Sequence, residues 1–427
     1  MIDAGIDAGR HDTWRHDARR QVVADLERRL RERRPGHTLP GACYVDPDLY
    51  RLDLERIWYR EWIFVAHTVE VPERGSYVTA AVGDHQIVIV RGGDDRIRAL
   101  HNVCRHRGSL VCSDVSGIAR HRLVCPYHQW SYELDGKLAR TRSAGDDVDV
   151  DSLGLLPVAC EVAGDSMIFV SFADAPPDFA PMRTLTDEYL APFELGTAQI
   201  AARSVTVEEA NWKLVMENNR ECHHCRGNHP ELCTSFPEAP LHTGGATAAD
   251  ARALERVVAR GAAHGLPSDF IASPDHQFRA MRMPLKGDTR SMTADGAPAV
   301  NRRFGNLPDV NLGDVLLYHY PTCWNHFMAD HAVTFRMLPL GPTRTQLTTT
   351  WLVPAGASRG ADYEVDELTR VWTITNAQDT ELVERTQRGV RSPAYRPGPY
   401  APVDELGVIQ FVDWYAERML SKPVAVR

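Results

Sequence analysis

Long hydrophobic runs are absent from this sequence. No apolar stretch approaches the roughly 20 residues that a bilayer-spanning helix needs, and the tract 1–9 lacks the charged-then-apolar order of a signal peptide. Basic residues are outnumbered, since 48 Lys and Arg stand against 57 Asp and Glu and the net charge is -9. Nucleic acids and anionic membranes attract basic surfaces. We therefore expect a cytoplasmic protein that binds neither of them and acts on a small molecule.

The cysteines show no disulfide framework. There are nine of them, an odd number, scattered through 427 residues. Disulfide-stapled folds are instead typical of short secreted chains with an even count. We expect reduced thiols and metal ligands rather than disulfides. A glycine-rich nucleotide-binding loop is missing as well, so a nicotinamide cofactor would have to act through a separate protein.

Hydrophobic periodicity divides the chain into three parts. The segment 1–44 has a helical pattern with one apolar face among many arginines. Short β-rich stretches separated by turn signals follow, which predicts an all-β domain at 45–175. Pro176-Pro177 marks its end, and 176–427 combines further strands with a long helix at about 365–388. We predict an α+β fold in which the segment 1–44 packs on the C-terminal domain.

The stretch 240–305 is rich in Ala, Gly, Asp and Arg. One helix is expected there, from Ala249 to His264. Long segments of this composition form either active-site lids or variable surface loops. The sequence leaves both roles open.

Four side chains that can bind a metal have a spacing in the β-rich domain that indicates one shared site. They form Cys104-x-His106 and, after eighteen intervening residues, Cys125-x-x-His128. Each pair falls on a predicted hairpin tip, so two loops can close on one cluster. Two thiolates on one iron and two imidazoles on the other make a Rieske [2Fe-2S] cluster. A tetrahedral zinc site is the alternative, but hairpin tips with these spacings are not typical of zinc fingers.

A second group of ligand-capable residues lies in 211–230. Glu221 and His224 are three residues apart and would share a helix face, and His229 follows five residues later. Gly227 and Pro230 disfavour a continued helix, so the second imidazole can turn back toward the first. Two imidazoles and one carboxylate form the facial triad of non-haem Fe(II) oxygenases.

The two groups together resemble the Rieske non-haem iron oxygenases of the ring-hydroxylating type, in their large or alpha subunit. The family pattern matches Glu217-Asn218-x-x-Glu221-x-x-His224-x4-His229, followed far downstream by an aspartate on a long helix. The resemblance assigns the third iron ligand to Asp379. Glu381 and Glu384 are weaker alternatives on the same helix.

The resemblance implies a fold, partners and a role for Glu221. It implies a Rieske domain at 45–175 and a helix-grip catalytic domain with an antiparallel sheet at 176–427. It also implies a homotrimer that receives electrons from NAD(P)H through a separate flavin and iron-sulfur reductase. In the family an acidic residue at position 221, more often Asp, connects an iron-ligand histidine to a Rieske histidine of the neighbouring subunit. Here those would be His224 and His128, and the helix-surface carboxylate is the alternative.

Within the family, residues 30 to 420 are most similar to the subgroup that demethylates quaternary ammonium compounds. Glycine betaine is the expected substrate, with dimethylglycine and formaldehyde as products; stachydrine, carnitine or an aromatic compound are the alternatives. A trimethylammonium group binds best among aromatic faces. The expected substrate-contacting residues are Tyr318, Tyr320, Trp324 and Phe327, with Phe411, Trp414 and Tyr415 nearby and His326 as a candidate carboxylate anchor.

Overall fold

The computed structural model describes residues 8–141, 149–238, 241 and 245–421. The outermost residues of the predicted segments 1–44 and 176–427, and part of the predicted Rieske domain, lie outside these ranges. The chain begins with a long helix, two short helices and a π-helical turn: α1 (Ala8–Glu32), α2 (Ala42–Val45), α3 (Pro47–Asp53) and η1 (Leu54–Trp58). Helix α3 begins at Pro47 because the Asp46 side chain accepts a hydrogen bond from the amide of Asp48 at 2.8 Å.

The first sheet has seven antiparallel strands in the order β1-β10-β9-β4-β3-β2-β5. Its strands are β1 (Ile63–His67), β2 (Ser76–Val82), β3 (His85–Arg91), β4 (Ile97–His101), β5 (Ser116–Ile118), β9 (Pro157–Ala163) and β10 (Met167–Ser171). A small sheet joins β6 (Leu123–Val124), β7 (Ser131–Tyr132) and β8 (Leu138–Arg140). The prediction of an N-terminal β domain is confirmed.

The second sheet is also antiparallel, in the order β11-β17-β16-β15-β14-β13-β12. Its strands are β11 (Gln199–Glu208), β12 (Ile271–Ala272), β13 (Phe278–Met283), β14 (Asp314–His319), β15 (Cys323–Phe327), β16 (Ala332–Gly341) and β17 (Arg344–Val353). The accompanying helices are α4 (Ala180–Leu190), α5 (Trp212–Asn219), α6 (Cys225–Asn228), α7 (Ala248–Ala263), α8 (Val365–Val390) and α9 (Leu406–Leu420). The predicted α+β fold with a long C-terminal helix is therefore confirmed.

Alternation along the strands divides the core between the two faces of this sheet. Leu316 and Tyr318 on β14 pack in the large core that includes residues of α5, α8 and α9. Val315 and Leu317 point the other way, into a second core with α4. The face that carries Leu316 and Tyr318 is the one on which the candidate site lies.

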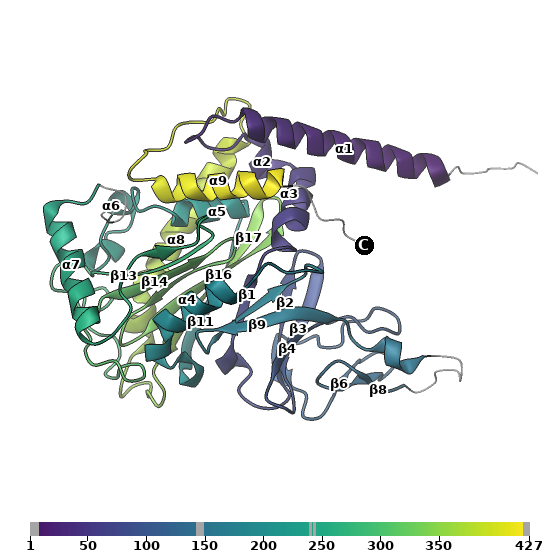
Figure 1. Cartoon of the computed structure of the whole chain (residues 1–427), viewed down its shortest axis with the longest axis horizontal. Coiled ribbons are helices and arrows are strands. Elements are labelled where there is room, and N and C mark those ends of the chain that lie inside the picture. Colours follow the sequence, from purple (N-terminus) through teal and green to yellow (C-terminus); the bar gives the residue numbers. More distant parts are fainter. Residues whose placement is uncertain (1–7, 142–148, 239–240, 242–244, 422–427) are drawn as a thin grey trace, which may run out of the picture.

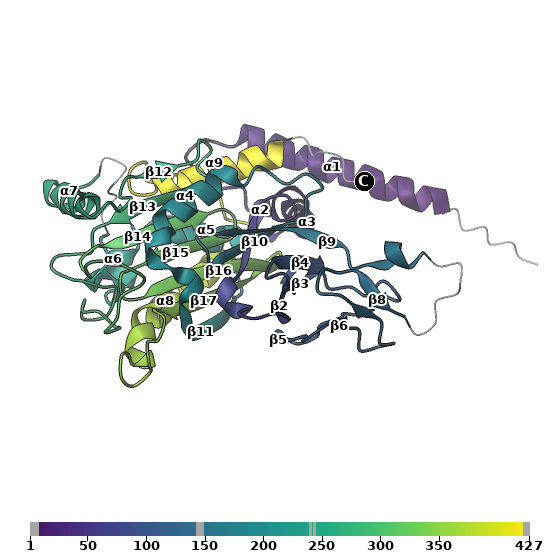
Figure 2. The same cartoon turned by 60° about the horizontal axis from the view of Figure 1, so that its bottom comes forward.

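Two groups of elements lie at opposite ends of the long axis of the molecule. Figures 1 and 2 show β6 and β8 at one end and α6 and α7 at the other. Helix α1 runs out from the body beside α9, and the Arg33 guanidinium after it pairs with Asp413 on α9. The helical segment at the N-terminus thus contacts α9.

A buried ion pair links the start of the chain to α5. Asp53 at the end of α3 and Lys213 on α5 pair with fully buried side chains. Asp53 also accepts hydrogen bonds from Trp212 Nε1 at 3.0 Å and from Tyr415 Oη at 2.8 Å. Every oxygen of this carboxylate is therefore satisfied, which is the condition under which a buried charge is tolerated.

A second carboxyl, that of Glu217 on α5, lies between two phenols. It accepts hydrogen bonds from Tyr44 Oη at 2.8 Å and from Tyr400 Oη at 2.9 Å. Burial raises its pKa from the ordinary 4.5 to about 7, although the two phenols oppose that change. The folded state therefore holds a proton here that the unfolded chain loses above about pH 4.5.

Replacing Glu217 by glutamine is expected to flatten the pH dependence of stability. The wild-type carboxyl contributes most below about pH 4.5, and that contribution is lost as the pH rises through about 7. Since part of the side chain remains exposed, we expect a loss of about 2 kcal/mol between pH 5 and pH 8. Thermal unfolding of both proteins at the two pH values measures it. Equal changes in Tm with pH for the two proteins would contradict this prediction.

Candidate active site

The ligand-rich segment begins on a helix but leaves it before Glu221. Helix α5 starts at Trp212, where Asn211 accepts a hydrogen bond from the amide of Lys213, and it ends at Asn219. The Glu221 carboxylate accepts hydrogen bonds from the amides of His223 and His224 and so fixes a tight turn. The expectation that Glu221 and His224 share a helix face is wrong, because both residues lie beyond the end of α5. The turn brings their side chains together instead.

Three side-chain atoms converge after this turn. His224 Nε2 lies 3.0 Å from His229 Nε2, and Asp379 Oδ1 lies 3.0 Å from His229 Nε2 and 3.4 Å from His224 Nε2. Asp379 Oδ1 is buried, and none of the described residues donates a well-aligned hydrogen bond to it. Ligands at about 2.1 Å from a metal, set at right angles, lie about 3.0 Å apart. These residues therefore fit one divalent metal ion with open positions.

Both imidazoles are oriented through their other nitrogen. His224 Nδ1 lies 2.5 Å from Glu221 Oε1, and His229 Nδ1 lies 2.8 Å from Gln378 Oε1. An acceptor at Nδ1 fixes the tautomer whose Nε2 is free to bind a metal. Burial lowers the pKa of His224, but the nearby Asp379 and Glu221 carboxylates outweigh burial and raise that pKa to about 9. Binding of a metal ion is therefore expected to release protons.

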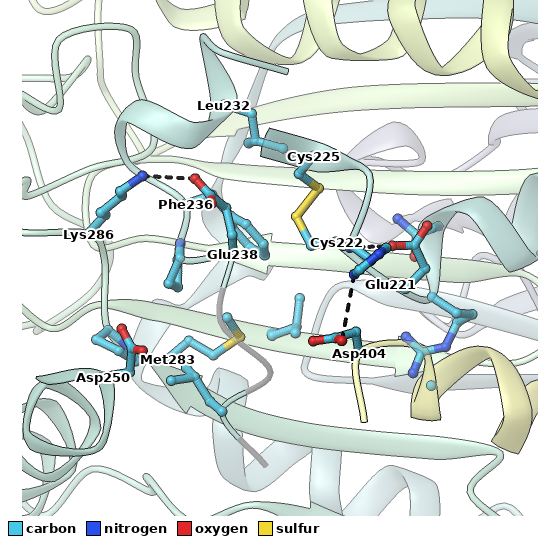
Figure 3. A pocket seen from close by; sticks show the side chains of 18 of the residues that line it. Glu221, Cys222, Cys225, Leu232, Phe236, Glu238, Asp250, Met283, Lys286 and Asp404 are labelled. Atoms are coloured by element: carbon cyan, nitrogen blue, oxygen red, sulfur yellow. Dashed lines mark hydrogen bonds and ion pairs between the residues drawn. A yellow bond between two sulfur atoms is a disulfide. The ribbon is translucent and has the colours of Figure 1, made fainter. Parts of the chain in front are cut away.

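Two cysteines of the segment depart from the expected reduced state. Cys222 and Cys225 form a disulfide that closes the turn around His224, and Figure 3 shows it on the wall of the cavity. The expectation of reduced thiols is wrong for this pair, because the turn places residues three apart side by side. Cys225 lies near both imidazoles, but as a disulfide sulfur it has no thiolate to offer a metal. The other described cysteines are free.

The loops that carry Cys104, His106, Cys125 and His128 lie beside each other. Gly108, with φ of 75°, closes the first loop through a hydrogen bond from its amide to the Cys104 carbonyl at 3.0 Å. Both cysteines are buried, while the His106 and His128 rings lie 4.5 Å apart toward the surface. The arrangement offers two thiols on the inner side and two imidazoles on the outer side. It fits a [2Fe-2S] cluster with mixed ligands.

Neighbouring polar groups contact the sulfur atoms of Cys104 and Cys125. Tyr132 Oη lies 3.2 Å from Cys104 Sγ and accepts a hydrogen bond from the amide of Arg105. Burial raises the pKa of Cys125, but backbone amides directed at the sulfur and the neighbouring Cys104 outweigh it, and the net pKa is lowered. Hydrogen bonds to cluster sulfurs are one means by which a protein sets a reduction potential.

A cavity of about 880 Å³ opens onto the three converging ligand atoms. Its wall includes two of the predicted substrate residues, Tyr318 and His326. Tyr320, Trp324 and Phe327 lie outside the lining; Phe327 points into the core on the opposite face of the sheet. Residues of α7 also form part of the wall. The stretch 240–305 therefore contributes directly to the cavity.

Several wall residues were missed in the sequence. Phe236 and Trp372 supply aromatic faces, and the Trp372 ring stacks on His326 with centroids 5.0 Å apart. Gln378 contacts His229 and is not part of the cavity wall; its place directly before Asp379, a predicted ligand, was the available signal. Arg279 lies on β13, a strand that sequence inspection overlooked because it contains two arginines and no β-branched residue.

Two protein-family models match this chain. The Rieske [2Fe-2S] domain matches residues 61–153, and the catalytic domain of the ring-hydroxylating alpha subunit matches residues 196–421. Both ranges lie inside the predicted domains 45–175 and 176–427. Separately, none of the helices in the described ranges is long and apolar enough to cross a membrane.

Two relatives align with nearly the whole chain, and a third aligns with about half of it. The glycine betaine monooxygenase oxygenase subunit of Chromohalobacter salexigens is 46% identical over 95% of this chain and 90% of its own. That of Pseudomonas aeruginosa is 40% identical over 94% and 93%. The carnitine monooxygenase oxygenase subunit of Escherichia coli is 36% identical, but over 46% of this chain and 54% of its own.

Solved structures share the fold. A quaternary ammonium Rieske monooxygenase in complex with L-carnitine superimposes with a TM-score of 0.67 at 22% identity, covering 92% of this chain and 98% of its own. Naphthalene 1,2-dioxygenase from Rhodococcus gives a TM-score of 0.65 at 19% identity, with 94% and 98% covered. At these identities the likeness concerns the fold alone.

Proposed function

This chain belongs to the ring-hydroxylating alpha-subunit family with a Rieske [2Fe-2S] domain, and from that premise we propose that it removes an N-methyl group from glycine betaine. It is the oxygenase subunit of a monooxygenase that works with a separate NAD(P)H-dependent flavin and iron-sulfur reductase. The observation that carries the proposal is the convergence of His224, His229 and Asp379 on the cavity wall. The relatives of 46% and 40% identity favour glycine betaine.

When bound, the [2Fe-2S] cluster and a mononuclear iron would supply the redox chemistry, namely electron transfer and activation of O2. We assign the cluster to Cys104, His106, Cys125 and His128, and the mononuclear iron to the three converging residues. Glu221 holds His224 in the tautomer whose Nε2 binds iron.

The other residues bind and place the substrate. Phe236 and Trp372 offer aromatic faces to a trimethylammonium group on the cavity wall. Oxygen inserted into one methyl C–H bond gives an N-hydroxymethyl ammonium. Loss of its hydroxyl proton and cleavage of the C–N bond, whose electron pair stays on nitrogen, release formaldehyde and leave dimethylglycine.

We further propose a homotrimer in the cytoplasm. The cluster loops and the α6 turn lie at opposite ends of one chain (Figure 1), an arrangement that favours electron transfer between subunits. Glu221, which is 12% exposed at its side chain, is the proposed link from His224 to His128 of a neighbouring subunit.

Incubation with a matching reductase, NADH and O2 tests the function. Glycine betaine is expected to yield formaldehyde and dimethylglycine in equal amounts, measured by a colorimetric assay and by mass spectrometry. Carnitine, stachydrine and an aromatic hydrocarbon serve as parallel substrates. Turnover of one of these, with no formaldehyde from glycine betaine, would reject the proposed substrate and leave the oxygenase class intact.

A further inference from the structure

Two arginines on the cavity wall have no counterion among the residues that the structure describes. Arg220 follows α5 and is 4% exposed, and Arg279 is half-buried on β13. Among the described residues, no carboxylate lies within 4.0 Å of either guanidinium. Within the part of the chain that the structure describes, Arg220 Nη1 and Arg279 Nε are buried and have no hydrogen-bond partner. Buried unpaired donors on charged groups cost free energy, so an anionic ligand would stabilise this pair.

Tyr318 holds the two guanidinium groups in place. Arg279 and Tyr318 are cross-strand neighbours in the register of β13 and β14. The Cζ atoms of Arg220 and Arg279 lie 4.0 and 4.7 Å from the centroid of the Tyr318 ring. Such stacking orients the planar donors before a ligand arrives.

Arg220 is fixed from two further directions. Its Nε donates a hydrogen bond to Tyr320 Oη at 2.5 Å. On the other side lies Gly407 of α9, where a Cβ atom would stand 2.3 Å from the Arg220 carbonyl oxygen and 3.2 Å from its Nη2. Only glycine permits this approach of α9. The guanidinium group is therefore positioned by its surroundings rather than by a counterion.

The charges of the cavity confirm that the pair is uncompensated. Burial, and next to it the charge of Arg220, lowers the pKa of Arg279 to about 10. The acidic side chains on the cavity wall have partners elsewhere: Glu221 with His224, Asp379 with both histidines, Glu238 with Arg226 and Lys286, Asp404 with His223, and Asp250 with Thr247. His326, which the sequence suggested as an anchor for the substrate carboxylate, also has a partner, since its Nδ1 lies 2.6 Å from Asp314 Oδ2.

We infer that Arg220 and Arg279 form a carboxylate-binding subsite that holds the anionic end of the substrate while its trimethylammonium end faces the iron ligands. The inference rests on the proposed function and adds the basis of its specificity. Planar guanidinium groups match the two oxygens of a carboxylate. Choline carries the same trimethylammonium group but a hydroxyl in place of the carboxylate. Its binding would leave both arginines unpaired, so the subsite selects against it.

Calorimetric titration of the holoenzyme with glycine betaine and with choline tests the subsite. Arg279→Gln is expected to weaken glycine betaine binding by roughly 10- to 100-fold and to leave choline binding unchanged within about twofold. Arg279→Lys keeps the charge but loses the planar donors, and is expected to recover part of the affinity. Lys286→Gln is the matched control, because Lys286 lies on the same wall but is paired with Glu238 (Figure 3). It should change neither affinity.

The outcomes separate the subsite from the function. Each variant is first shown to keep the visible spectrum and iron content of the wild type, and Arg220→Gln repeats the comparison from the other arginine. Suppose that the wild type releases formaldehyde from glycine betaine. If the Arg279 and Arg220 variants then weaken the binding of glycine betaine and of choline equally, or weaken the binding of neither, the subsite is refuted and the function stands. If the wild type releases none and does not bind glycine betaine, both fail.

Discussion

Replacing Asp379 by alanine is expected to abolish formaldehyde release while leaving the cluster spectrum intact. Asp379 supplies one of the three atoms that converge within 3.0 to 3.4 Å, and its Oδ1 has no other well-aligned partner. Loss of a group that merely supports a metal ligand costs about 10- to 100-fold, so loss of a ligand should cost at least about 100-fold. Turnover with glycine betaine and iron analysis measure the two effects.

Glu381→Ala provides the control for this result. Glu381 lies two residues further along α8, is exposed, and pairs with Arg385, so its removal should preserve iron and turnover. The comparison also tests the alternatives raised by the sequence, because Glu381 and Glu384 are carboxylates on the same helix. If Asp379→Ala keeps its full iron content while Glu381→Ala or Glu384→Ala loses iron, the ligand assignment is wrong.

Asp53→Asn is expected to have the largest effect on stability. Asparagine keeps the shape, but its single carbonyl oxygen can accept from only one of Trp212 and Tyr415, which donate to different oxygens of Asp53. It also leaves the Lys213 ammonium buried without an opposite charge. Breaking a buried pair from one side costs about 3–5 kcal/mol. For domains of this size that corresponds to a fall in Tm of roughly 10 °C, measurable by calorimetry.

Two further variants distinguish a charge effect from a packing effect. Asp413→Asn removes a carboxylate of α9 that is 46% exposed and paired with Arg33, and it should cost no more than about 1 kcal/mol. Adding Lys213→Met to Asp53→Asn removes the unpaired charge and is expected to restore part of the lost stability. A double variant no more stable than the single one would show that the charge is not the cause.

Much of the fold was predictable because it rests on periodicity. The long amphipathic pattern near 365–388 corresponds to α8 (Val365–Val390), since one apolar stripe must face the sheet. The apolar stretches of the second sheet likewise became β14, β16 and β17. Strand β13 was missed because its two arginines and two methionines do not look like a strand. The sheet accepts Arg279 and the two methionines because they face the cavity, whereas Arg282 is buried and donates to the carbonyls of Pro267 and Leu312.

In the candidate site, too, the features that follow from local sequence were predictable and those that depend on the course of the backbone were not. Spacing within a short segment predicted His224 and His229 as a pair, and local chain geometry brings their Nε2 atoms to 3.0 Å from each other. Asp379 was assigned by resemblance, and nothing in its own sequence neighbourhood distinguishes it from Glu381. The Cys222–Cys225 disulfide and the Arg220–Arg279 pair depend on the course of the backbone through a turn and across a sheet. Composition and spacing do not encode that course directly.

Gly407 gives the protein a further means of setting selectivity. It lies on the cavity wall and decides how closely α9 can approach Arg220. Any side chain at this position would displace the guanidinium or the helix, and so would alter the distance between the two ends of an accepted substrate. Divergence toward longer or uncharged quaternary amines could therefore begin at this glycine, with the iron ligands unchanged.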